Sequence, residues 1–119
     1  MDEAQALAAF GALAQTHRLR IVRHLVTAGP DGVAAGALAG AVGVSTSNLS
    51  FHVKELEHAG LIASRREGRS ILYSAAYPAL GGLIQFLMRD CCQGHPDVCA
   101  PALSALDACR ILTDDERHR

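Results

Sequence analysis

The sequence predicts a mainly helical domain that carries a single β-hairpin. Aromatic residues make up only 4% of the chain while Ala, Leu, Val and Gly dominate, which is typical of helices packed through small side chains. A capped amphipathic segment runs without proline from Ser45 to Gly60, and two short β-type runs follow it around an arginine-rich turn. Because 119 residues are enough for one core but few for two, we expect one domain over residues 1–119.

Two helices are expected before the first chain break, which is the glycine- and proline-containing run at residues 29–32. The first, over residues 2–13, has one apolar side, so it either packs on its own domain or helps to form a dimer. The second begins at Thr16 and keeps Arg20 and Arg23 in water. The apolar side of the first helix consists of Leu7, Phe10 and Leu13, and the expected buried face of the second consists of Leu19, Ile21, Val22, Leu25 and Val26.

Residues 33–60 contain a short helix, a glycine-containing turn and a longer helix. The short segment, Val33 to Val44, places Leu38 and Val42 one turn apart, and its three glycines make the helix dependent on packing. Gly43 lies in the turn, and Ser45 is a favourable N-cap for the helix that follows. These elements together predict a helix-turn-helix over residues 33–60.

The helix after Ser45 has two chemically different sides. At about 100° per residue, Leu49, Val53 and Leu56 share one face, with His52 at its edge. The other side has short donors and acceptors, one cation and one exposed ring, which suit the base edges and backbone of a DNA groove, although many polar helix faces are simply solvated. The candidate DNA-binding residues of this helix are Ser45, Ser47, Asn48, Ser50, Phe51 and Lys54.

Residues 61–74 predict a β-hairpin, with strands at residues 61–64 and 70–74 and a turn between them. Arg65, Arg66 and Arg69 are expected in that turn, where they can contact phosphates or a minor groove. Edge strands also carry charges simply to stay soluble. The preceding helix pair favours the interpretation as a wing, so the fold class is a winged helix-turn-helix.

Pro78 begins a further helix whose apolar band is wider than one small domain requires. The band consists of Leu80, Leu83, Ile84, Leu87 and Met88. Together with the first helix it is the best candidate for a dimer interface, although an ordinary core helix would have the same pattern. A last short helix is expected over residues 100–112, followed by a charged tail.

The formal net charge of −1 argues against a protein that is basic throughout. Between His17 and Tyr73, however, seven Arg or Lys residues face only four acidic ones, and a dimer would double this local excess. No apolar run reaches membrane length and no signal-peptide pattern is present, so we expect a cytoplasmic protein without a membrane partner.

The strings LAQTHRLRIVRHL, LAGAVGVSTSNLSFHVKELEHAGLI and SRREGRSILYS resemble the ArsR/SmtB family of winged helix-turn-helix repressors, from about Leu13 to Ser74. The resemblance implies a homodimer joined through the first and fifth helices, which binds double-stranded operator DNA at an inverted repeat and releases it when a metal or metalloid binds. Thr46, Asn48 and Phe51 depart from residues common in the family, so the operator sequence cannot be inferred from relatives.

Four cysteines occur, at positions 91, 92, 99 and 109, and metal binding or redox chemistry is more expected than a disulfide framework in a cytosolic protein. Within the family, a cysteine pair at the end of the fifth helix with a third cysteine shortly after resembles the arsenite-responsive sites. The resemblance therefore assigns Cys91, Cys92 and Cys99 as ligands of As(III) or Sb(III), within a dimer and metalloid-binding segment over residues 78–99. Three soft thiolates complete the pyramidal coordination of either ion.

Other uses of these cysteines remain open. His95 could complete a Cys3His site for Zn²⁺ or cadmium, and the vicinal pair could act as a thiol redox switch. Cys109 is expected to be a small buried hydrophobe, but it could replace Cys99, and the site could be shared between subunits. We do not expect an enzyme, because a Cys-x-x-Cys motif, a Gly-rich phosphate loop and a plausibly spaced His-carboxylate pair are all missing. A protein-binding module with structural zinc is a further alternative.

Overall fold

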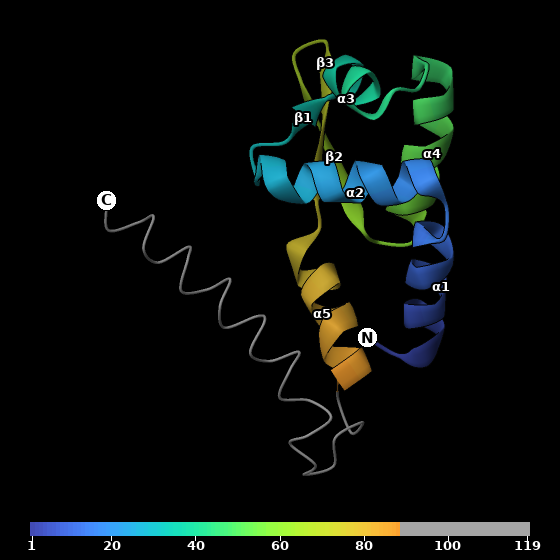
Figure 1. Ribbon diagram of the computed structural model, residues 1–119. Helices are drawn as coiled ribbons and strands as arrows, with labels where there is room; N and C mark the ends of the chain where they lie inside the picture. Colours follow the sequence, from blue (N-terminus) through green and yellow to red (C-terminus); the bar gives the residue numbers. More distant parts are fainter. Residues whose placement is uncertain (89–119) are drawn as a thin grey trace, which may run out of the picture. The chain divides into compact units, whose positions relative to one another are not determined.

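A computed structural model describes residues 1–88, which form five helices and three short strands (Figure 1). The chain order confirms the predicted mainly helical fold with one hairpin. The elements are α1 (Glu3–Leu13), α2 (Thr16–Ala28), β1 (Val33–Ala34), α3 (Ala35–Val42), α4 (Thr46–His58), β2 (Ile62–Glu67), β3 (Ser70–Ala75) and α5 (Tyr77–Met88). The predicted helix at residues 100–112 lies outside the described residues, and the single domain over residues 1–119 stays a prediction.

The sheet is antiparallel, with strand order β1-β3-β2. Strands β2 and β3 pair from Ile62 opposite Ala75 to Glu67 opposite Ser70, so only Gly68 and Arg69 remain for the turn. Gly68 has a φ of +64°, a conformation that glycine adopts without steric cost. The hairpin is therefore longer and its turn tighter than the sequence pattern predicted. Strand β1, which the sequence analysis missed, consists of two residues and pairs with β3.

The core lies where α2, α3 and α4 meet the sheet. Helix α2 contacts α1, α3, α4 and β3, and in Figure 1 it crosses in front of the strands. Aliphatic side chains from the helices and from the start of the hairpin fill this core. Their burial is the main term that stabilises the fold. The largest fully buried side chains are Ile21, Leu25, Leu38, Leu49, Leu56 and Leu61.

The predicted buried face of α2 was too wide. Ile21, Val22 and Leu25 are buried as expected, but Leu19 and Val26 are 46% and 43% exposed. The core-facing stripe, from Ile21 through Leu25 to Val22, is about 100° wide. Val26 and Leu19 lie about 40° and 60° beyond Val22, on the side away from that stripe. Their predicted burial was wrong because apolar identity was taken as sufficient, whereas each residue's angle on the helix decides which side chains reach the core.

Helix α1 packs on the domain through alanines and presents its larger apolar side chains outward. Ala6, Ala9 and Ala12 are buried, whereas Leu7 is 66% and Phe10 37% exposed. The helix begins with a capping box in which Asp2 and Gln5 satisfy each other's backbone N–H groups. Both roles considered for this helix are thus compatible with its structure: a small-residue side meets the core, and a large-residue side stays uncovered.

Helix α5 begins at Tyr77, one residue before the predicted start at Pro78. The Tyr77 hydroxyl donates a hydrogen bond of 3.2 Å to the carbonyl oxygen of Val26, which ties the start of α5 to α2. Leu83 is buried, while Ile84 is 44% exposed. The apolar band of α5 is therefore divided between the core and the surface. None of the helices within residues 1–88 is long and apolar enough to cross a membrane.

Candidate nucleic-acid interface

Local sequence fixes both ends of the helix that carries most of the candidate site. Gly43 ends α3 in the left-handed region, with a φ of +82°, where an L side chain would be strained. Ser45 then caps α4, because its Oγ accepts a 3.1 Å hydrogen bond from the backbone N–H of Asn48. Leu49, Val53 and Leu56 are buried, as predicted, and they anchor α4 against α2 and α3. These contacts determine which side of α4 faces outward.

The outward side of α4 carries the predicted set of polar and aromatic groups. All of these side chains are exposed, so the predicted face exists, while their contact with DNA stays a prediction. Phe51 alone among them is a large apolar residue, and it is 58% exposed. The exposed candidates on α4 and at its cap are Ser45, Ser47, Asn48, Ser50, Phe51 and Lys54.

Behind this face, a cluster of rings and one guanidinium joins α2 to α4. The Nε of Arg18 donates to the Nδ1 of His52 over 3.3 Å, and the Arg18 guanidinium carbon lies 5.4 Å from the centre of the Phe51 ring. The His52 ring meets Phe51 in an edge arrangement and His17 in a tilted one, each at 5.6 Å. Sequence analysis placed His52 at the edge of the buried face but missed Arg18, because no local pattern links residues 34 positions apart.

The cluster favours the neutral form of His52. Its Nδ1 accepts a hydrogen bond, so in the neutral ring the proton is assigned to Nε2. Burial lowers the pKa of His52 below its ordinary value of 6.5, and the charge of Arg18 and the neighbouring His17 lower it further. A neutral, buried His52 can therefore orient Arg18 against α4 without adding charge to that helix.

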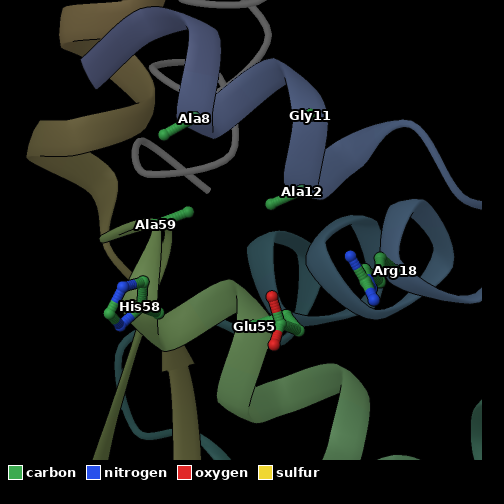
Figure 2. A pocket seen from close by; sticks show the side chains of 7 residues that line it. All are labelled: Ala8, Gly11, Ala12, Arg18, Glu55, His58 and Ala59. Atoms are coloured by element: carbon green, nitrogen blue, oxygen red, sulfur yellow. The ribbon is translucent and has the colours of Figure 1, made fainter. Parts of the chain in front are cut away.

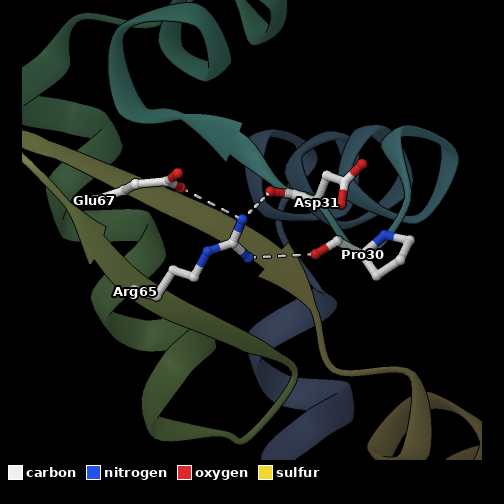
Figure 3. Close-up of polar contacts among 4 residues, drawn as sticks. All are labelled: Pro30, Asp31, Arg65 and Glu67. Atoms are coloured by element: carbon white, nitrogen blue, oxygen red, sulfur yellow. Dashed lines mark hydrogen bonds and ion pairs between the residues drawn. The ribbon is translucent and has the colours of Figure 1, made fainter.

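The three arginines of the hairpin differ in position and contacts. The prediction that all three lie in the turn was partly wrong. Arg65 and Arg66 lie in strand β2, and only Arg69 lies in the turn. Figure 3 shows Arg65 directed toward the loop after α2: its Nη2 donates to the carbonyl oxygen of Asp31 over 2.6 Å and its Nη1 to that of Pro30 over 3.4 Å. Arg66 and Arg69 are exposed and are better placed to meet a phosphate.

Arg65 therefore has a structural role in addition to any contact with DNA. Its Nη2 also lies 3.7 Å from the Glu67 carboxylate, in an exposed ion pair that contributes little by itself. The hydrogen bonds to the two carbonyl groups join the base of the wing to the loop before β1. In the hairpin ladder, Arg65 pairs with Leu72, so it belongs to the strand and not to the turn.

A shallow hollow of about 270 Å³ lies where α1, α2 and the end of α4 meet (Figure 2). Ala8, Gly11 and Ala12 of α1 form one wall, and Arg18, Glu55 and His58 contribute its polar groups. Small side chains of α1 leave this space open. Helices α1 and α4 contact each other, and the hollow between them is open to solvent, so it does not enclose a ligand.

The predicted metalloid ligands follow the part of the chain that the structure describes. Cys91, Cys92 and Cys99 lie outside the described residues, as do the alternative ligands His95 and Cys109. Within residues 1–88, no group of three or more His, Cys, Asp or Glu side chains could hold a metal ion. Residues 1–88 thus contain no alternative metal site built from these side chains. The assignment of the three cysteines as metalloid ligands rests on the sequence.

A family model described as a helix-turn-helix domain matches residues 13–65. An uncharacterised HTH-type transcriptional regulator of Mycobacterium tuberculosis is 37% identical over 75 residues, which span 63% of this chain and 64% of that protein. The chain therefore covers slightly less than two thirds of that relative. The HTH-type transcriptional regulator YgaV of Escherichia coli is 35% identical over 79 residues, covering 66% of this chain and 80% of that protein.

Solved structures show the same architecture. An ArsR-like transcriptional regulator from Rhodococcus sp. RHA1 superposes with a TM-score of 0.67 at 27% identity, covering 86% of this chain and 93% of that one. A homodimeric winged helix-turn-helix DNA-binding domain from Mycobacterium bovis, a possible ArsR-family regulator, has a TM-score of 0.59 at 30% identity, covering 77% and 85%. The first three of these relatives are named as transcriptional regulators, and the Mycobacterium bovis domain as a possible one.

Proposed function

Because the chain belongs to the ArsR family of helix-turn-helix transcriptional regulators, we propose that it is an arsenite- or antimonite-responsive repressor that acts in the cytoplasm. It binds operator DNA as a homodimer and releases the DNA when a thiolate site near the end of α5 takes up the metalloid. The DNA-binding part of this proposal rests on described residues. The ligand part rests on the chemistry of the cysteines.

The observation that carries the proposal is the exposed outer face of α4. A major groove admits one α-helix, and base edges there present hydrogen-bond donors, acceptors and the thymine methyl group. Ser47, Asn48 and Ser50 supply short polar groups, and Lys54 supplies a charge for a phosphate. All are exposed while the opposite side of the helix is anchored in the core. This combination suits entry into a groove without any change in the fold.

The wing extends the contact along the DNA backbone. Arg66 and Arg69 are exposed on the hairpin, and Arg65 fixes the hairpin base to the loop after α2. We expect Arg66 and Arg69 to neutralise phosphates beside the groove that α4 enters. Arg65 contributes chiefly by holding the wing at its angle. The net charge of −1 is no obstacle, because phosphates respond to the local excess of positive charge rather than to the total.

Dimerisation is supported by the apolar side chains that α1 and α5 leave uncovered. Leu7 is 66%, Phe10 37% and Ile84 44% exposed, which is costly in water and is relieved when a second copy covers them. A two-fold dimer repeats the same patch on both subunits. Its two α4 helices would then enter successive major grooves of an inverted repeat, about one helical turn apart.

The proposed ligands are Cys91, Cys92 and Cys99, which follow the described part of α5. Arsenite and antimonite exchange hydroxyl groups for thiolates, and three such ligands complete a pyramidal site. The segment CCQGHPDVC holds three thiols within nine residues. Binding near the end of a helix at the dimer interface would alter the angle between the two α4 helices. A shift from almost fully bound to almost fully released DNA requires about 5.5 kcal/mol of differential binding.

A second candidate is a zinc- or cadmium-responsive repressor of the same fold. The observation that favours it is His95, which lies inside the same cysteine segment and could complete a Cys3His set. Adjacent cysteines diverge by about 100° on a helix, which makes them awkward ligands of a tetrahedral ion. A thiol redox switch at the Cys91–Cys92 pair is chemically possible but would more naturally use a cysteine from a distant helix.

The DNA-binding part is tested by fluorescence anisotropy on the segment immediately upstream of the gene, measured over a range of salt concentrations. We expect tight binding whose logarithm falls linearly with the logarithm of salt, because phosphate contacts release counterions. A duplex of equal length from within the coding sequence serves as the control and should bind more weakly. Equal binding to both duplexes, or no binding to either, would contradict the proposal.

A further inference from the structure

We propose that Phe51 determines sequence specificity by contacting the 5-methyl group of a thymine, and that Arg18 is the positioning residue for its ring. The inference rests on the proposed DNA-binding function and adds the chemistry of one base contact. Three observations carry it: the exposure of the Phe51 ring, the contacts that hold the ring from behind, and the chemistry of base edges in the major groove.

Phe51 is a large apolar side chain on a face that is otherwise polar. It is 58% exposed, and its neighbours on that side are Ser47, Ser50 and Lys54. An aromatic ring in water gains free energy when an apolar group covers it. Phe51 is the sixth of the thirteen residues of α4, so the ring belongs to the N-terminal half of the helix, whereas the acidic residues Glu55 and Glu57 lie in the C-terminal half. In helix-turn-helix proteins the N-terminal residues of the recognition helix are the ones that contact base edges.

The ring is held in place from within the domain. The Arg18 guanidinium lies over it at 5.4 Å, and the edge arrangement with His52 at 5.6 Å restricts it further. Arg18 is itself fixed by the hydrogen bond from its Nε to the Nδ1 of His52, which is only 8% exposed. A ring fixed before binding loses less rotamer freedom on contact, so more of the contact free energy appears as affinity.

The groups that bases present in the major groove determine which base a phenyl ring can contact favourably. Guanine, cytosine and adenine present only hydrogen-bond donors and acceptors there, which a phenyl ring cannot satisfy. Thymine alone presents a methyl group. The serines of the same face can bond to several bases and therefore discriminate weakly, so a single apolar contact can supply sequence preference that they do not. Phe51 in this way favours operators with a thymine at the position it meets.

The test replaces thymines one at a time by deoxyuridine, which removes only the methyl group. Operator duplexes are first selected with the purified full-length protein from a pool of randomised double-stranded DNA. Each thymine in a half-site is then exchanged, and binding is measured by anisotropy. For the wild-type protein, we expect one position at which the exchange weakens binding roughly fourfold, the factor for burying one methyl group. Exchanges at flanking thymines are the matched control and should have no effect.

The variant Phe51→Ala links the methyl effect to the ring. It should bind the thymine duplex more weakly than wild type and bind the thymine and deoxyuridine duplexes equally well. Phe51→Leu, which keeps an apolar side chain, should retain part of the discrimination. Arg18→Lys keeps the charge but lacks the planar guanidinium and the Nε donor, so we expect an unchanged salt slope together with a smaller methyl effect.

The outcomes separate this inference from the proposed function. If the protein selects no DNA, the proposed function fails, and the inference fails with it. If the protein binds DNA and no deoxyuridine exchange weakens wild-type binding, only the inference is overturned, whatever the variants do. A methyl effect that persists unchanged in Phe51→Ala would assign the contact to another residue. Loss of self-association in Phe51→Ala without a methyl effect in wild type would place the ring in a protein interface instead.

Discussion

His52 places a titratable ring on the buried side of α4, where it contacts both Arg18 and Phe51. Burial, Arg18 and His17 all lower its pKa below 6.5, and Arg18 and His17 both approach it from α2. A protonated His52 could no longer accept the hydrogen bond from Arg18, and it would add a second cation beside the guanidinium. The cluster is therefore built for the neutral ring.

We predict that His52 makes the protein lose stability as the solution becomes acidic. Because the pKa is lower in the folded state, the contribution of His52 is fully present above pH 6.5 and is lost as the pH falls from 6.5 through the lowered pKa. Urea unfolding of wild type and of His52→Gln, followed at several pH values, measures this. The variant should lose less stability across that window. His24→Gln, at an exposed histidine of α2, is the control, and an identical slope in wild type and His52→Gln would refute the prediction.

Arg65 and Arg66 are neighbours in β2 with different predicted roles. Arg65→Ala should lower the free energy of unfolding by roughly 0.5–1.5 kcal/mol, because it removes the hydrogen bonds to Pro30 and Asp31. Arg66→Ala should change stability by less than about 0.5 kcal/mol but weaken DNA binding across sequences and reduce the salt slope by about one. Denaturation and salt-dependent anisotropy on both variants distinguish the roles. A salt slope unaffected by Arg66→Ala would remove the wing from the interface.

At the scale of elements, the start of α4 is capped by one side-chain hydrogen bond, which the Asn48 backbone N–H donates to the Ser45 hydroxyl. Ser45→Ala should therefore lower the free energy of unfolding by about 1 kcal/mol. Ser47→Ala, in the first turn of the same helix, is the matched control and should leave stability unchanged or slightly higher, since alanine has the better helix propensity. Thermal or urea unfolding measures both. Equal losses in the two variants would mean that Ser45 does not act as a cap.

Elements with local signals were predicted well, and those that depend on tertiary contacts were not. The cap at Ser45, the stop at Gly43 and the burial of Leu49, Val53 and Leu56 all follow from short-range pattern. The two-residue strand β1 is defined by its pairing with β3, and two residues are too few for a sequence pattern to predict a strand. The length of β2 was underestimated because its outward charges resembled a turn.

The candidate DNA-binding site also has parts that local sequence predicts and parts that depend on tertiary contacts. The exposed face of α4 was predictable because a helix with one anchored side must expose the other. The hydrogen bond between Arg18 and His52, and the contacts of Arg65 with Pro30 and Asp31, join residues more than 30 positions apart, so they required the three-dimensional fold. The assignment of Cys91, Cys92 and Cys99 remains a prediction from the sequence, outside the described residues.

At the scale of the whole molecule, the proposed function requires a dimer. Within residues 1–88, Leu7 of α1 is the most exposed large apolar side chain. We predict that Leu7→Lys yields a monomer, because it buries a charge in the proposed interface, and that DNA affinity then falls by an order of magnitude or more. Sedimentation equilibrium and anisotropy measure the two effects. Val26→Lys is the control, because it makes the same change at an exposed apolar position on α2. A dimeric Leu7→Lys would show that α1 is not in the interface.

In the proposed mechanism, the cysteine segment would couple the dimer to its ligand. We predict that Cys91→Ser and Cys92→Ser bind operator DNA as tightly as wild type but fail to respond to arsenite, since each removes one of three thiolates. Cys109→Ser is the matched control and should keep its response. Anisotropy of the preformed complexes during an arsenite titration measures this. Loss of DNA binding in Cys91→Ser or Cys92→Ser would instead identify the cysteines as structural.

The most direct test of the central claim is a titration of the wild-type protein on its upstream DNA. Arsenite, antimonite and zinc are added in separate runs under reducing conditions, and release is followed by fluorescence anisotropy. Three thiolates suit As(III) and Sb(III), so we predict release by micromolar arsenite or antimonite and none by zinc. Release by zinc alone would contradict the claim and transfer the assignment to a Cys3His site that includes His95.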